Sequence, residues 1–216
     1  MFRSKLILNF KKIVYLFAAV GVSSALAGSY EDFFRAADVD DPYTVRRLVQ
    51  RGFDVNSRSP QGQTALILAL RGESYKVAEA LMQEPTLDVN AVNASDETSL
   101  MIAALKGQAD WTQRLLERGA QVNKPGWSPL HYAATGPDAG IVKLLLDRGA
   151  AADAESPNRS TALMMAAQYG NDASVDLLLA RGANPKARND RGLSAGDFAR
   201  LAKREALAKR LDALAR

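Results

Sequence analysis

The sequence predicts an all-α repeat solenoid, in which pairs of antiparallel helices stack one on another. The main observation is a short motif that recurs along the chain, a hydroxyl residue followed by an apolar run. Its copies begin at Thr64, Thr98, Ser128, Thr161 and Ser194, which are 34, 30, 33 and 33 residues apart. A second observation is that glycine closes most units after an apolar segment. A motif that returns at this interval is the signature of stacked structural repeats.

The first half of each unit predicts a helix that begins at the hydroxyl residue. The clearest copy is Ser128-Pro129-Leu130-His131-Tyr132-Ala133-Ala134. Serine and threonine cap helix N-termini, and proline is favoured at the first helical position because its missing N–H is not needed there. The Thr64, Thr98 and Thr161 copies follow the same order, and the Ser194 copy is weaker.

The second half predicts another helix with a glycine stop. The segment 141–150 reads Ile-Val-Lys-Leu-Leu-Leu-Asp-Arg-Gly-Ala, and similar segments occur in most of the other units. Glycine ends helices because it adopts the left-handed backbone conformation without steric cost. The expected stops are Gly52, Gly119, Gly149 and Gly182.

These motifs together resemble the ankyrin repeat family, over about residues 30–216. The resemblance implies helix-turn-helix pairs joined by β-hairpin fingers, with about four full repeats between an N-terminal and a C-terminal capping unit. It also implies a binding scaffold, because the family serves many unrelated partners. The expected units of the domain 28–216 are about 30–56, 57–90, 91–123, 124–153, 154–186 and 187–216.

The first 27 residues predict a signal peptide. A basic segment ends at Lys12, an apolar segment begins at Ile13, and Ala25-Leu26-Ala27 has the small-residue pattern of a cleavage site. We expect cleavage after Ala27 and a periplasmic location, with no stable membrane span after cleavage. The alternative is an uncleaved anchor that holds the repeats on the same side of the membrane.

Composition excludes several classes of function. Residues 1–27 hold four of the 28 basic residues and no acidic one, so residues 28–216 balance 24 basic against 24 acidic side chains. The positive net charge therefore gives no support for nucleic-acid binding. The chain has no cysteine, which removes disulfides, thiolate metal sites and cysteine catalysis.

The sequence favours a protein that is not an enzyme and holds no cofactor or metal. His131 is the only histidine, and the family resemblance implies that it ties adjacent turns together by hydrogen bonds. One histidine without cysteine leaves little material for a zinc site or a serine triad. The alternative is a haem or small-ligand carrier that uses His131 with Met164 or Met165.

Two junctions depart from the repeat pattern. Pro85 stands where the first full repeat should have its glycine, so we expect that helix to end differently. The junction 124–127 has four residues where the others have seven. The shortened finger predicts a notch with Trp127 at its floor, and Trp127 is either a binding anchor or a packing residue under the hairpin.

Binding through a concave face and finger tips is the function that the repeat scaffold favours. Counting positions within the unit gives nine candidate partner-binding residues: Gln63, Arg71, Glu97, Trp127, Tyr132, Asn158, Arg159, Tyr169 and Arg191. The structural positions are the five motif residues Thr64, Thr98, Ser128, His131 and Thr161 and the four glycine stops.

The resemblance to small exported bacterial ankyrin proteins implies two roles for a protein of this kind. One is support of catalase in oxidative-stress defence, and the other is neutralisation of a secreted toxin by an immunity protein. We expect a monomer with a protein partner. A head-to-tail stack of chains is the alternative, because the first helix is acidic and the last is basic.

Overall fold

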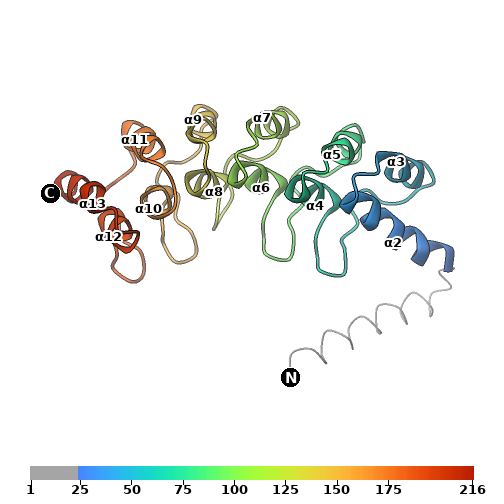
Figure 1. The fold of residues 1–216 in the computed structure, drawn as a ribbon, viewed down its shortest axis with the longest axis horizontal. Helices are drawn as coiled ribbons and strands as arrows, with labels where there is room; N and C mark the ends of the chain where they lie inside the picture. Colours follow the sequence, from blue (N-terminus) through green and yellow to red (C-terminus); the bar gives the residue numbers. More distant parts are fainter. Residues whose placement is uncertain (1–23) are drawn as a thin grey trace, which may run out of the picture. The chain divides into compact units, whose positions relative to one another are not determined.

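The computed structural model describes residues 24–216. They form twelve helices that alternate between an inner and an outer position, and no segment among them forms a strand (Figure 1). The fold class predicted from the sequence is confirmed. The residues group into two compact units, one ending at Ser95 and one beginning at Asp96.

The first unit contains two helix pairs. Its helices are α2 (Ser24–Asp38), α3 (Pro42–Gln50), α4 (Ala65–Gly72) and α5 (Tyr75–Met82). Helix α2 packs against α4, and α3 packs against α5. The rings of Tyr30, Phe33, Phe34 and Phe53 form an aromatic cluster, in which Phe33 and Phe53 have centroids 4.5 Å apart. The buried core begins with this cluster.

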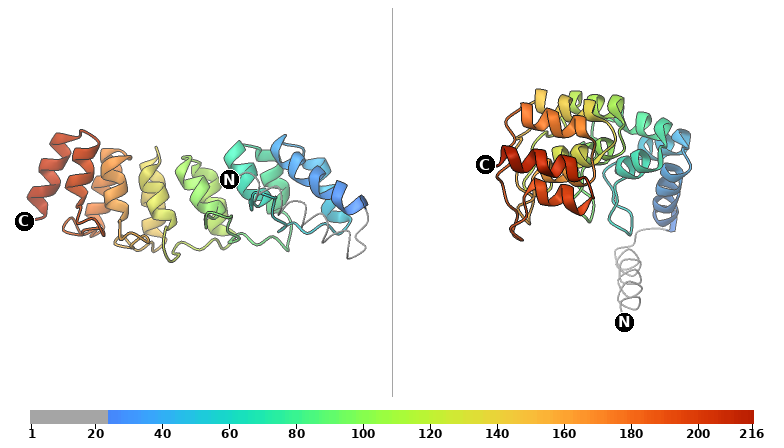
Figure 2. Two further views of the ribbon diagram at one scale, coloured as in Figure 1. Left: turned by 90° about the horizontal axis from the view of Figure 1, so that it is seen from below. Right: turned by 60° about the vertical axis from the view of Figure 1, so that its left-hand side comes forward.

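The second unit contains four helix pairs. Its inner helices are α6 (Ser99–Leu105), α8 (Pro129–Thr135), α10 (Ala162–Gln168) and α12 (Ala195–Leu201), and its outer helices are α7 (Ala109–Glu117), α9 (Ala139–Asp147), α11 (Asp172–Ala180) and α13 (Glu205–Leu214). Each inner helix packs on the next one, which gives the row seen in two further views in Figure 2.

Two sets of equivalent residues form the core of the repeats. The inner helices contribute one alanine per repeat, which is the smallest side chain that still favours a helix and lets neighbouring backbones approach. The outer helices contribute one leucine per repeat. All are buried: Ala36, Ala69, Ala103, Ala133, Ala166 and Ala199, with Leu48, Leu81, Leu115, Leu145, Leu178 and Leu211.

Local signals fix where the helices begin and end. Thr64, Thr98, Ser128, Thr161 and Ser194 are the N-cap residues of the five inner helices α4 to α12. Gly52, Gly119, Gly149 and Gly182 have φ between 85° and 94°, which is the left-handed region. Pro85 replaces the left-handed glycine in the first full repeat. Helix α5 ends at Met82, and the Glu84 N–H donates to the Leu81 carbonyl.

The fingers are tight turns that lack a β-ladder. The Ser59 N–H donates to the Gln63 carbonyl at 2.8 Å, and the Ser156 N–H donates to the Ser160 carbonyl at 2.9 Å. Among residues 24–216 one isolated bridge, Arg58 with Thr64, is all that remains of the expected hairpins. These turn hydrogen bonds, with hydrogen bonds between neighbouring fingers, take the place of a ladder.

The expected signal peptide falls mostly on residues 1–23, which lie outside the described residues. Helix α2 begins at Ser24 and continues through Gly28, the expected start of the mature chain, into the first repeat. In the part of the chain that the structure describes, no helix has the length and apolarity that crossing a bilayer requires.

Candidate functional site

The shortened finger brings several sequence-predicted residues together in the second unit. Tyr132 lies on α8, and its hydroxyl donates to the Glu97 carboxylate at 3.1 Å. Lys124 forms an ion pair with Asp96, and its side chain is only 13% exposed. Lys124 is the first residue of the shortened finger, and the Asp96 carboxylate neutralises its mostly covered ammonium group. We call Asp96, Glu97, Lys124, Trp127 and Tyr132 the finger patch.

Trp127 is half-buried at the base of the shortened finger. Its ring meets the His131 ring edge-to-face, with centroids 5.3 Å apart and an interplanar angle of 79°. One side of the indole therefore packs on the repeat, while part of the ring remains accessible. This contact agrees with the packing interpretation of Trp127, and the binding-anchor interpretation stays a prediction.

His131 is 1% exposed and uses both ring nitrogens. Nδ1 accepts from the Ser128 N–H at 3.2 Å and lies 2.8 Å from the Ser128 hydroxyl, while Nε2 lies 2.9 Å from the Ser160 carbonyl of the next finger. A carbonyl only accepts hydrogen bonds, so these contacts assign the proton to Nε2. Burial lowers the pKa of His131, although hydrogen bonds to the Ser160 and Ala154 carbonyls oppose this in part. The ring is neutral at pH 7 and structural.

Two methionines occupy the His131 position in neighbouring repeats. The Met101 and Met164 sulfurs accept from the Thr98 and Thr161 N–H groups at 3.4 Å, as Nδ1 does at Ser128. Both methionines are fully buried. Two of the three side chains that the haem-carrier alternative names, His131 and Met164, are therefore buried and already hydrogen-bonded.

A row of exposed apolar residues lies at the C-terminal ends of the inner helices. Leu105 of α6 is 36% exposed, Tyr169 at the end of α10 is 60% exposed, and Leu201 of α12 is 58% exposed. Leu105 and Leu201 occupy the same position in their repeats, and Tyr169 is one position further on. We call these three residues the helix-end row.

Leu201 was not among the residues predicted from the sequence. Its position in the unit is that of Arg71 and Leu105, so the repeat count could have found it. Exposed aromatic and aliphatic side chains in a row are the kind of surface that anchors a protein partner.

The remaining candidates of the second unit lie on its last two fingers. The Asn158 carboxamide oxygen accepts from the Ser156 hydroxyl at 2.6 Å and the Ser160 N–H at 3.2 Å, so Asn158 shapes its own turn. Arg159 makes two hydrogen bonds to Glu155, at 3.1 and 3.2 Å. Arg191 is exposed at the next turn.

Gln63 and Arg71 belong to the first unit and therefore do not join the finger patch. The Gln63 amide oxygen accepts from Asn93 at 3.1 Å, which links two neighbouring fingers of that unit. Arg71 is exposed at the end of α4. The residues brought together are thus those of the second unit, around Trp127 and along the helix-end row.

The acidic side chains and the histidine of the described residues do not form a cluster suited to a metal ion. Between residues 24 and 216, no three His, Asp or Glu side chains gather as a metal site would require. Trp111, the second tryptophan, is 8% exposed and packs under the Arg114 guanidinium, whose carbon lies 4.3 Å from the ring centroid.

Comparison with protein families agrees with the helix pairs and their capping motifs. The family model described as "Ankyrin repeats (3 copies)" matches residues 33–125 and 100–189. The chain belongs to the ankyrin repeat family. Ankyrin repeats present extended binding surfaces for other proteins, so the chain is a protein-interaction scaffold.

The curated relatives share the ankyrin repeats but are much longer than the region they share. The B-cell lymphoma 3 protein homolog of Mus musculus is 33% identical, over 68% of this chain and 35% of its own length. Zygote-specific protein 3 of Chlamydomonas reinhardtii is 36% identical, over 67% and 40%. The chain therefore spans well under half of these relatives.

A solved structure matches this ankyrin chain over almost its whole length. It is one chain of the complex between the predatory endopeptidase Bd0816 from Bdellovibrio bacteriovorus and immunity protein Bd3460. The match has a TM-score of 0.71 and 26% identity, and it covers 84% of this chain and 97% of the other.

Proposed function

We propose that this ankyrin protein binds a partner enzyme outside the cytoplasm and holds it inactive, as an immunity protein does. The observation that carries the proposal is the second unit's combined surface, the finger patch together with the helix-end row. It presents aromatic and aliphatic side chains that are accessible to a partner, whereas the single histidine is buried and fully hydrogen-bonded. The near full-length similarity to a chain from an endopeptidase–immunity protein complex supports this choice.

Tyr169 gives the most direct test of the surface. Its side chain is exposed, so Tyr169→Ala should leave the fold intact while weakening the complex by about 10-fold or more, as loss of a tyrosine anchor does. Tyr43→Ala is the matched control, because Tyr43 is an equally exposed tyrosine in the first unit. Both variants should melt like the wild type in circular dichroism.

The partner is identified by capture from the host. The tagged chain is cross-linked in its host, and proteins retained by the wild type and by Tyr43→Ala but not by Tyr169→Ala are identified. The purified partner is then assayed with and without the chain. A lytic enzyme, such as a peptidase, whose activity falls on adding the chain supports the immunity role. A partner whose activity is unchanged by the chain contradicts it.

Support of a catalase is the second role that the family resemblance implies. The same capture tests it, because a catalase retained by the wild type and lost with Tyr169→Ala would replace the immunity role with this one. In that case catalase activity in the host should fall when the chain is deleted.

The location outside the cytoplasm rests on residues 1–27 of the sequence. Basic residues, an apolar segment and the Ala25-Leu26-Ala27 pattern form the order that export signals share. Intact mass measurement of the protein purified from its host tests this: a chain that begins at Gly28 agrees with cleavage and export. A full-length chain recovered from the cytosol would contradict the proposed location.

A further inference from the structure

The two ends of the repeat array carry opposite net charge. The first repeat, residues 30–56, has six acidic and four basic side chains, while the last, residues 187–216, has eight basic and four acidic ones. The same sign difference holds for the whole units. Residues 24–95 contain ten acidic and seven basic side chains, and residues 96–216 contain 14 acidic and 17 basic ones.

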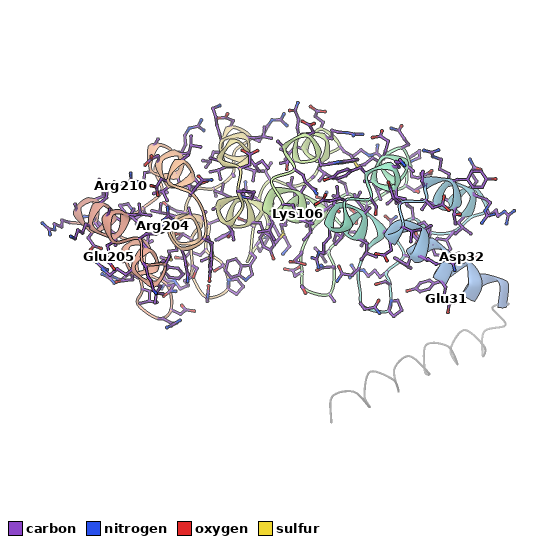
Figure 3. The ribbon with its side chains drawn as sticks, in the orientation of Figure 1. Glu31, Asp32, Lys106, Arg204, Glu205 and Arg210 are labelled. Carbon is purple, nitrogen blue, oxygen red and sulfur yellow. The ribbon has the colours of Figure 1, made fainter. Side chains whose placement is uncertain are left out.

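Several charges of the first repeat are already used within it. Asp32 pairs with Arg35 at 2.5 Å, and Asp41 caps α3 by accepting from two backbone N–H groups. Glu31 and Asp38 are different, because both are exposed and neither forms an ion pair with any described residue. Figure 3 labels Glu31 and Asp32 on α2, from which both side chains project.

The last repeat has basic side chains of both kinds, some paired with carboxylates and some without an ion pair. Arg200, Arg204 and Arg210 pair with Asp212, Asp172 and Asp176, and Figure 3 labels Arg204 and Arg210 near α13. Lys203 and Lys209 are exposed and form no ion pair within residues 24–216. The first repeat thus carries a net charge of −2 and the last a net charge of +4, and Glu31, Asp38, Lys203 and Lys209 are among their exposed side chains without an ion pair.

Exposed apolar residues accompany these charges at both ends. Val39 in the first repeat is 65% exposed, and Leu214 in the last is 50% exposed. Terminal repeats normally present a polar outer face, because no neighbour covers them. Apolar side chains beside uncompensated charges are more typical of an interface.

The last repeat also has a hollow where a further repeat would stack. Its volume is about 330 Å³, and its lining is Pro185, Lys186, Arg188, Ser194, Asp212 and Ala215. One repeat earlier, Asp153 occupies the Lys186 position, and its carboxylate accepts from the Asn184 N–H of the following unit at 2.7 Å. The hollow is therefore the position that a following unit fills elsewhere in the array.

We propose that the first repeat of a second copy of this chain binds the last repeat, so that chains associate head to tail. The acidic first repeat complements the basic last repeat in charge, and both present the helix-pair geometry that stacks within the array. The contact joins two different surfaces, so it leaves one free surface of each kind and continues to grow. Each added copy also adds one partner-binding surface, which raises the avidity for a multivalent target.

The association should depend on concentration and salt. We would measure sedimentation velocity of the chain, purified in the form that its host produces, over a series of concentrations. At about 0.01 M salt, where exposed charges interact over about 30 Å, the average mass should rise with concentration; at about 1 M salt it should fall to the monomer. A monomer at every concentration in low salt overturns the proposal, as does an association that strengthens with salt.

Charge reversal at each end identifies the surfaces. The N-variant, Glu31→Lys with Asp38→Lys, and the C-variant, Lys203→Glu with Lys209→Glu, should each remain monomeric. Their equimolar mixture should associate again and grow with concentration, because the native first repeat complements the native last repeat and the reversed first repeat complements the reversed last repeat. A chain that carries all four substitutions has the wild-type net charge and should associate again.

Three outcomes would contradict the head-to-tail contact. A mixture that stays monomeric excludes this pair of surfaces, and so does a monomeric chain with all four substitutions. Dimers of the N-variant alone would show a symmetric contact instead. Circular dichroism melts of each variant confirm that a lost association is not lost folding.

Discussion

Individual buried polar residues differ in whether the fold satisfies them. Thr112 on α7 is buried, and its hydroxyl donates to the Gln108 carbonyl at 2.9 Å. Ser174 on α11 is equally buried, yet its hydroxyl has no hydrogen-bond partner. A buried hydroxyl without a partner loses its hydration and gains nothing in return, so the two residues should respond oppositely to removal of the hydroxyl.

We expect Ser174→Ala to raise the free energy of unfolding by up to about 1 kcal/mol, because it removes an unsatisfied buried group. Thr112→Val keeps the side-chain volume but loses a paired hydroxyl, and should lower that free energy by about 1 kcal/mol. Urea titrations of the two variants and the wild type measure both effects. A destabilised Ser174→Ala would mean that its hydroxyl has a partner after all.

His131 should make stability depend on pH. Its pKa in the folded chain is lowered by burial, while the unfolded value is about 6.5. Between the two values the unfolded chain binds a proton that the folded chain does not. Stability is therefore lost as pH falls from about 6.5 toward the folded pKa, by at most about 1.4 kcal/mol per pH unit.

His131→Met tests this with a residue that the chain already uses at the equivalent positions 101 and 164. The variant should be less stable at neutral pH by about 1 kcal/mol, because it loses the hydrogen bond to the Ser160 carbonyl. Between pH 7.5 and 5.5 it should lose less stability than the wild type, because it has no histidine to protonate. Equal losses in the two proteins would rule out His131 as the source.

At the scale of elements, glycines serve two different purposes. Gly149 ends α9 with φ of 87°, and an added Cβ would meet open space. At Gly170, between α10 and α11, an added Cβ would lie 2.2 Å from the Ala134 carbonyl oxygen of the preceding repeat. The first glycine is needed for its backbone conformation and the second for close approach.

Alanine substitution separates these purposes. Gly149→Ala should cost about 1 kcal/mol, the penalty of a left-handed non-glycine residue. Gly170→Ala should cost about 1–3 kcal/mol or more, because a backbone carbonyl must move to admit the methyl group. Denaturant titrations of both variants give the comparison. A smaller effect at position 170 than at position 149 would contradict the close packing of the two repeats there.

The helices could be predicted from the sequence because their signals are local. A cap such as Thr64 or a stop such as Gly182 acts on backbone groups within a few residues of itself. The ends of the helices can therefore be recognised from short stretches of sequence. The fingers were predicted less well. Their hairpin arms lack a ladder, since their length depends on how neighbouring fingers pack, as at Asp190, whose N–H donates to the Asn158 carbonyl at 3.1 Å.

The candidate site was predictable only in part, because exposure depends on tertiary packing. Repeat position pointed to Trp127, Tyr132 and Tyr169. It did not reveal that the Lys124 side chain is mostly covered and paired with Asp96. Asn158 illustrates the reverse error: a polar finger-tip residue whose side chain is used inside its own turn.

At the scale of the whole molecule, each repeat contacts only its neighbours, so damage should stay local. Arg204 is the main tie of the last repeat. One of its nitrogens donates to the carbonyls of Ala166, Ala167 and Gly170, at 2.9, 2.9 and 3.0 Å, and another pairs with Asp172. Arg210, on α13 of the same last repeat, makes an exposed ion pair with Asp176 on α11.

We therefore expect Arg204→Met to loosen α12 and α13 while the first unit keeps its protection, because three carbonyls at the end of α10 lose their donor. Hydrogen exchange should show faster exchange of the last helix pair by about 10-fold or more, equivalent to a loss of about 1.4 kcal/mol. Arg210→Met is the matched control, since an exposed ion pair contributes about 0–1 kcal/mol. Faster exchange spread evenly over α2 to α13 would show instead that the array unfolds as one cooperative body.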